Sequence, residues 1–168
     1  MHHQIPKFQF EAAWCLTNIA TGTTDNVHNL IEKDVLRHFL ELLNSPHIEV
    51  VEQAIWGIGN IAGDNHLTRD CVINSGALEK ISSLLKQATP QTSFMRNASW
   101  ALSNLCRGRP QPKYEKVRVA IPTLIKVLVE NDDDLIVNDI CWALSYLSDG
   151  EKQRIDDLSD IRLLKKMI

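Results

Sequence analysis

The sequence predicts an all-α protein in which one structural unit is repeated along the chain. Its four tryptophans, Trp14, Trp56, Trp100 and Trp142, follow one another at intervals of 42, 44 and 42 residues, a period typical of helical repeat arrays. Apolar residues near each tryptophan recur with helical spacing, whereas no stretch keeps the two-residue alternation of a strand. Because a unit of about 42 residues cannot cover its own apolar face, we expect neighbouring units to stack and bury it jointly.

Pro6 is well placed to begin the first helix, which we expect over about residues 7–20. Gly22 is expected to adopt the left-handed conformation at its end, and Asp25 to cap the helix that follows. Clear breaks lie at residues 44–47 and 108–112, where proline and glycine gather. The apolar patterns between these breaks predict further helices through residues 27–31, 35–43, 50–61, 67–73, 78–85, 98–105, 117–130 and 135–147, with another beginning near 155.

The repeats divide the chain into units of similar length. We expect an N-terminal extension at residues 1–6, a partial repeat at 7–24, full repeats at about 25–64, 65–109 and 110–149, and a partial repeat at 150–168. The solenoid would then hold about three to four repeats and be truncated at both ends. Such truncation predicts a piece of a longer solenoid, or ends that associate with other chains.

Composition narrows the classes of function. Hydrophobic residues make up 44% and charged residues 23% of the chain, a globular balance. The net charge of -3 argues against nucleic acid as the main partner. The four cysteines form no Cys-x-x-Cys pair, and the chain has neither a signal-peptide pattern nor 18 consecutive apolar residues. We therefore expect a soluble protein that is not secreted, with reduced cysteines, of which Cys15 and Cys141 are buried beside tryptophans.

A polar or aromatic partner follows each tryptophan at the same distance. Residues that are four apart on a helix lie on the same face. Each unit therefore presents an indole beside the side chain of Asn18, Asn60, Asn104 or Tyr146. Stacked helices about 8 to 10 Å apart would align the rings as ridges, and an extended peptide advances about 3.3 Å per residue across them. Indole faces suit Lys and Arg, amides suit a peptide backbone, and the carboxylates of Asp64 and Asp139 would select for cations.

Two other interpretations compete with a peptide-binding ladder. A tryptophan at a single helical apolar position is most often a core residue, although an asparagine beside it is a poor core residue. For an enzyme, the six histidines form no metal-spaced cluster and no Ser, His and Asp stand in a recognisable motif. We therefore expect no catalysis, no metal and no cofactor.

The segments at residues 10–23, 52–64, 96–108 and 141–150 resemble the third helices of successive armadillo repeats in importin α. The resemblance covers nearly the whole chain from about Lys7 onward. It implies a right-handed armadillo superhelix whose concave groove binds Lys/Arg-rich nuclear localisation signals in extended form. A nuclear import adaptor of this kind would occur in the cytoplasm and the nucleus.

Carried over by position, the resemblance implies a set of groove residues. The four tryptophans would line the slots for basic side chains, and Asn18, Asn60, Asn97 and Asn104 would hold the peptide backbone. The main lysine pocket corresponds to Gly22, Thr23 and Asp64, with the helix-end carbonyl of Gly63. Further groove positions are Gln53, Arg107, Asp139 and Tyr146.

The chain departs from the family pattern in several places. Val27 stands where the family offers a threonine to the lysine pocket, and Gly57 with Gly59 would soften the central helix by up to about 1 kcal/mol each relative to alanine. The family's basic segment for importin β and its minor cargo site have no counterpart, so we expect cargo binding without autoinhibition and without importin β. The alternative is an armadillo structural or scaffolding protein that binds acidic or other non-signal partners.

Overall fold

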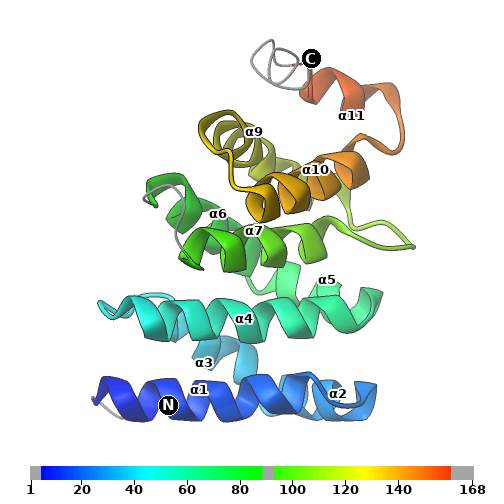
Figure 1. The fold of residues 1–168 in the computed structure, drawn as a ribbon. Coiled ribbons are helices and arrows are strands. Elements are labelled where there is room, and N and C mark those ends of the chain that lie inside the picture. Colours follow the sequence, from blue (N-terminus) through cyan, green and yellow to red (C-terminus); the bar gives the residue numbers. More distant parts are fainter. Residues whose placement is uncertain (1–4, 89–92, 160–168) are drawn as a thin grey trace.

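Four long helices form one layer of the molecule. The computed structural model describes residues 5–88 and 93–159, and in these ranges the chain is helical without any strand. Each long helix packs on the next in chain order, and each carries one tryptophan (Figure 1). They are α1 (Pro6–Ala20), α4 (Ile48–Asp64), α7 (Ser93–Cys106) and α10 (Asp134–Ser148).

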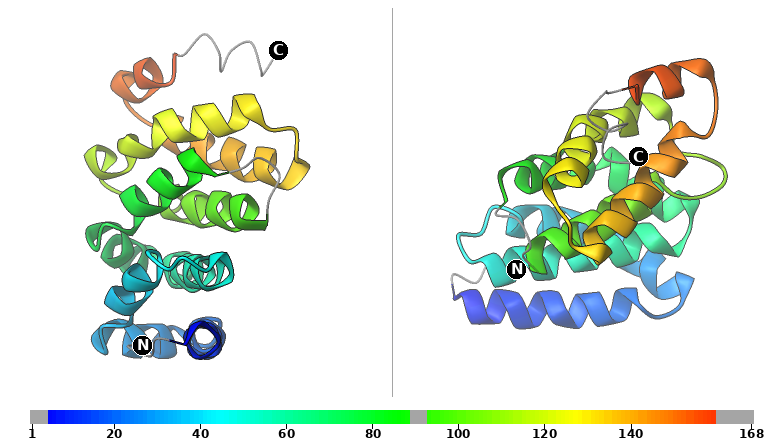
Figure 2. Two further views of the ribbon diagram at one scale, coloured as in Figure 1. Left: turned by 90° about the vertical axis from the view of Figure 1, so that its left-hand side faces the viewer. Right: turned by 45° about the horizontal axis from the view of Figure 1, so that its top comes forward.

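Shorter helices form a second layer beside the long ones, as the left view of Figure 2 shows for the first two units. α11 follows α10, and residues 160–168 of the helix expected near the C-terminus lie outside the described residues. The shorter elements are α2 (Thr24–Glu32), α3 (Val35–Leu42), α5 (His66–Asn74), α6 (Ala77–Gln87), α8 (Tyr114–Val117), the 3-10 helix η1 (Arg118–Ala120), α9 (Ile121–Glu130) and α11 (Lys152–Asp157).

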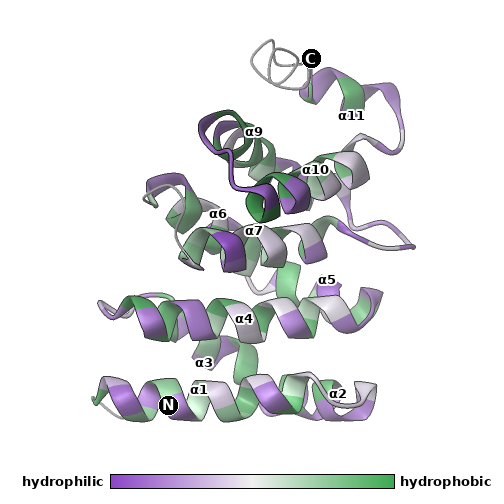
Figure 3. Ribbon diagram, viewed as in Figure 1, coloured by the Kyte–Doolittle hydropathy of each residue, from purple (hydrophilic) through white to green (hydrophobic). Residues whose placement is uncertain are grey.

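The core runs continuously between the two layers. In α4, Ala54, Ile55, Ile58 and Ile61 recur at helical spacing and are all fully buried, which is the apolar stripe that the sequence pattern predicts. Hydrophobic and hydrophilic stretches follow one another along each long helix (Figure 3), as expected of a helix that buries one side and exposes the other. The predicted α-solenoid is therefore confirmed.

Two predicted details of the first turn are wrong. The described residues with left-handed φ values include Gly76, Gly108 and Gly150 but not Gly22, because α1 ends in a right-handed turn whose N–H groups bond back to Asn18 and Ile19. The cap of α2 is the Oγ of Thr23, which accepts from the backbone N–H of Asn26 at 3.3 Å, rather than Asp25.

The expectation of buried Cys15 and Cys141 is also wrong. Both thiols are exposed, because a residue next to an outward-facing tryptophan is only about 100° further around the helix. Cys106 is the buried thiol instead, and its burial raises the pKa to about 12. This thiol therefore stays protonated and unreactive at neutral pH.

Candidate functional site

The four tryptophans occupy the same position in four stacked helices and follow one another along the long-helix face, which we define as the exposed side of α1, α4, α7 and α10. Trp14, Trp56 and Trp142 are 48%, 47% and 52% exposed. Trp100 is partly buried and packs against the core. The indoles thus remain available to a ligand.

Two of the asparagines tie α4 and α7 to the long helix before each of them. The Nδ2 of Asn60 donates to the carbonyl of Thr17 at 3.5 Å, and the Nδ2 of Asn104 donates to the carbonyl of Gly59 at 3.1 Å. Each bond uses one of the two N–H groups of the amide and leaves its oxygen as an acceptor. Asn18 is exposed on α1, and Asn97 is half-buried on α7.

Gln53 lies between two helices rather than on the open surface. Its side chain is 5% exposed, and its Nε2 donates to the hydroxyl of Thr17 at 2.9 Å. Thr17 in turn donates to the carbonyl of Ala13 at 2.9 Å. The geometry therefore gives Gln53 a role in joining α1 to α4, which the sequence pattern does not reveal.

Asp64, at the end of α4, has hydrogen bonds to both carboxylate oxygens. Thr24 donates its hydroxyl to Oδ1 at 3.0 Å, and Asn65 donates its Nδ2 to Oδ2 at 2.6 Å. Thr24 was missed by the sequence analysis, which placed Thr23 in this pocket. The bond joins residues 40 positions apart, so only the stacking of repeats brings them together. It orients a carboxylate that has no cationic partner among the described residues.

Arg107 contacts the residue that precedes Asp64. Its Nη2 donates to the carbonyl of Gly63 at 3.2 Å, so the helix-end carbonyl expected for a ligand ammonium already accepts one bond. Gly63, Asp64, Asn104 and Arg107 line one side of a cavity of about 260 Å³. This cavity continues the long-helix face at the C-terminal ends of α4 and α7.

A fully buried arginine holds the backbone of this loop. Arg69 of α5 is 1% exposed, and its Nη1 donates to the carbonyls of Arg107 at 2.8 Å and Pro110 at 2.9 Å. The rest of its guanidinium contacts Asp70, with Nη2 to Oδ1 at 2.8 Å. Since arginine is rarely buried, sequence patterns place Arg69 on the surface and miss its role in positioning Arg107.

The last tryptophan has a different environment. Tyr146 stacks on Trp142, with ring centroids 5.8 Å apart and an interplanar angle of 24°. Asp139, one turn before Trp142, is half-buried, and desolvation raises the pKa of its carboxyl above the ordinary value. Within the described ranges no ion pair or hydrogen bond compensates this burial.

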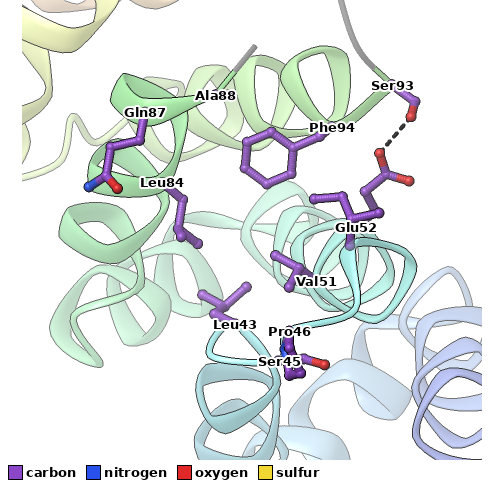
Figure 4. Close-up of a pocket in the computed structure, with 11 residues that line it drawn as sticks. Leu43, Ser45, Pro46, Val51, Glu52, Leu84, Gln87, Ala88, Ser93 and Phe94 are labelled. Carbon is purple, nitrogen blue, oxygen red and sulfur yellow. Dashed lines mark hydrogen bonds between the residues drawn. The ribbon is translucent and has the colours of Figure 1, made fainter. Parts of the chain in front are cut away.

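A second cavity of about 530 Å³ lies at the opposite ends of α4 and α7 and contains none of the predicted site residues. Figure 4 shows the apolar side chains of Leu43, Val51, Leu84 and Phe94 around it. Its one acidic group, Glu52, accepts a hydrogen bond from Ser93 at 2.5 Å.

Two further properties of the described residues bear on function. They contain no group of three or more His, Cys, Asp or Glu side chains that could hold a metal ion. None of their helices combines the length and apolarity that a membrane span requires.

A family model described as Armadillo/beta-catenin-like repeat matches residues 23–63, 65–107 and 113–149. The chain belongs to the armadillo-repeat family. An engineered protein of known structure is similar over 99% of this chain and 68% of its own, with a TM-score of 0.88 and 28% identity. A designed armadillo repeat protein in complex with the peptide (KR)4 matches over 98% of this chain and 79% of its own, with a TM-score of 0.78 and 23% identity. The second similarity supports the armadillo fold alone.

Named relatives confirm the resemblance to importin α. The chain is 44% identical to importin subunit alpha-2 of Arabidopsis thaliana over 97% of its length and 30% of the relative. It is 49% identical to importin subunit alpha-B of Dictyostelium discoideum over 97% of its length and 32% of the relative. The armadillo chain therefore spans about a third of these relatives.

Proposed function

We propose that the long-helix face binds an extended Lys/Arg-rich peptide of the nuclear localisation type, and that the protein acts in nuclear import between cytoplasm and nucleus. The peptide would cross the four long helices, with basic side chains between the indoles and its backbone against the asparagine amides. Similarity to importin α subunits supports this proposal, and so does the exposure of three of the four indoles.

The observation that carries the proposal is the carboxylate of Asp64. Both of its oxygens are oriented by neutral donors, Thr24 and Asn65, at 3.0 and 2.6 Å, and no described cation neutralises it. A carboxylate that is already oriented loses little conformational entropy on binding a lysine. Asp64 would therefore anchor the peptide, and the indoles would add about 0.5 to 2 kcal/mol for each cation they contact.

The chemistry of the flanking charges agrees with a cationic ligand. Arg96 is paired with Asp133 at 2.6 Å, and Arg109 with Asp149 at 3.0 Å, so two of the nearby guanidinium groups are neutralised. Asp139 remains a half-buried carboxylate beside Trp142. A cationic side chain at this position would offset the desolvation of Asp139.

The test is binding of a fluorescent Lys-rich peptide, measured by anisotropy at two salt concentrations. Asp64→Lys should weaken binding by about a hundredfold or more, because it replaces the anchor by a like charge. Glu79→Lys is the matched control, since Glu79 is an exposed carboxylate in the first turn of α6, and it should leave affinity nearly unchanged.

Wild-type affinity should also fall as salt rises. Preference for an acidic peptide, or equal binding by the wild type and Asp64→Lys, would contradict the proposal and favour a scaffold that binds other partners.

A further inference from the structure

At Gly59, in the middle of α4, the side chain of Trp100 from α7 lies close against the backbone. A β-carbon at this position would overlap the six-membered ring of Trp100, whose Cζ3, Cε3 and Cη2 are the nearest atoms. The carbonyl of the same residue accepts the hydrogen bond from Asn104 at 3.1 Å. Trp100 and Asn104 therefore both lie against the backbone of the same glycine.

The other long helices have a side chain at the equivalent position. Three residues after each tryptophan stand Thr17 in α1, Ser103 in α7 and Ser145 in α10. The tryptophan of the following helix is 47% exposed after Thr17 and 52% exposed after Ser103, but Trp100, which follows Gly59, is partly buried. Of these three indoles, the one that follows a glycine is the most buried, and it is the ring that a β-carbon on that glycine would meet.

We propose that Gly59 determines the specificity of the long-helix face by recessing Trp100 below the indoles on either side. The recess would leave depth for one long cationic side chain of a peptide that crosses α4, α7 and α10. Two helix spacings of about 8 to 10 Å correspond to about five or six extended residues, so the central residue of such a segment would lie over Trp100. The choice of ligand rests on the proposed function, whereas the depth of the indole does not.

The recess is tested first without any ligand. Protein labelled with 5-fluorotryptophan gives one ¹⁹F NMR signal for each indole, and single Trp→Phe variants assign them. Gly59→Ala should raise the response of the Trp100 signal to a soluble paramagnetic probe to the level of Trp56. Gly57→Ala is the matched control, because a β-carbon there would meet the ring of Phe39 instead.

If Gly59→Ala lowers stability, the opposite change at an equivalent position tests the same proposal. Ser103 stands in α7 at the repeat position that Gly59 has in α4, and Ser103→Gly should reduce the probe response of the Trp142 signal. Folded variants in which the Trp100 and Trp142 signals keep their wild-type response would overturn the proposal.

The second test uses peptides in which each lysine in turn is replaced by alanine. Gly59→Ala should weaken the parent peptide about threefold to tenfold, the loss of one cation contact, and should reduce the penalty of the alanine replacement at one peptide position only. Equal losses at every position would indicate general damage and overturn the specificity role. Absence of binding by the wild type would instead remove the proposed function, while the ¹⁹F result would still decide the recess.

Discussion

Asp64 and Asp139 stand on two different long helices, and their carboxylates are held in opposite ways. Asp64 accepts hydrogen bonds from Thr24 and Asn65 at 3.0 and 2.6 Å. Asp139 is half-buried, and desolvation raises the pKa of its carboxyl without a described partner to oppose it. The first carboxylate is oriented before a ligand arrives, whereas the second needs a ligand to compensate its burial. In the proposed peptide site, the same residue type would therefore supply affinity at one position and a conditional contact at the other.

The support of Asp64 extends beyond its two donors. Arg69 fixes the loop that carries Arg107, and Arg107 bonds the carbonyl of Gly63, the residue before Asp64. This chain of contacts links α5, the loop after α7 and the end of α4. The Asp64 end of the face is thus built from three elements.

The largest effect is expected from Arg69→Met. The variant should lower the free energy of unfolding by about 2 to 4 kcal/mol, because two carbonyls lose charge-assisted bonds inside the protein. Arg37→Met is the matched control: Arg37 is an exposed arginine bonded to Asp34 and Glu41, and its loss should leave the free energy of unfolding nearly unchanged. Urea denaturation measures both, and equal effects would show that Arg69 does not support this end of the face.

A second prediction concerns which threonine serves Asp64. Thr24→Val removes the hydroxyl that reaches Oδ1 and should weaken peptide binding about threefold to tenfold. Thr23→Val removes the cap of α2 instead and should lower stability by about 1 kcal/mol with little change in affinity. Anisotropy and thermal unfolding separate the two. A larger loss of affinity in Thr23→Val would support the assignment made by resemblance and contradict the one made from geometry.

The third prediction contrasts the two carboxylates directly. Asp139→Asn should weaken a Lys-rich peptide only about twofold to fivefold, much less than a substitution at Asp64. Its stability should stay equal to the wild type or rise by up to about 0.5 kcal/mol, because a charge that is costly to bury disappears. Titration calorimetry with chemical denaturation tests both parts, and a loss of stability would show that Asp139 has a compensating partner.

The arrangement of the helices could be predicted from the sequence because it depends on regular spacing. The intervals between tryptophans and the apolar stripe of α4 each follow from helical geometry, and the observed long helices agree with them. The single helix expected over 117–130 is instead divided among the end of α8, η1 and α9. Proline and glycine near residues 108–112 likewise mark the loop after α7. These signals are local or periodic, so one sequence contains them.

The contacts between repeats could not be predicted in the same way. The bond from Thr24 to Asp64 and the inward position of Gln53 depend on how closely α1 and α4 approach. The burial of Arg69 contradicts the usual preference of arginine for the surface. An interior glycine such as Gly59 was a visible signal of close packing, but its partner, Trp100, appears only when the helices are stacked.

The smallest effect is the pH dependence of Asp139, whose sign follows from the raised pKa. A carboxyl with a higher pKa in the folded state binds more protons when folded, so its contribution to stability decreases as the pH rises from the ordinary pKa through the raised value. The free energy of unfolding of the wild type should therefore fall furthest below that of Asp139→Asn at neutral pH. This difference in stability should shrink as the pH falls through this window.

A bound lysine should lower the pKa of Asp139 again, because an opposite charge favours the ionised form. Peptide binding should then release protons, and affinity should decline as the pH falls through the raised pKa. The carboxyl ¹³C signal of Asp139, followed with and without a Lys-rich peptide, measures both effects. If the titration of Asp139 does not change when the peptide is added, Asp139 does not contact the peptide. Asp64 would then be the acidic contact.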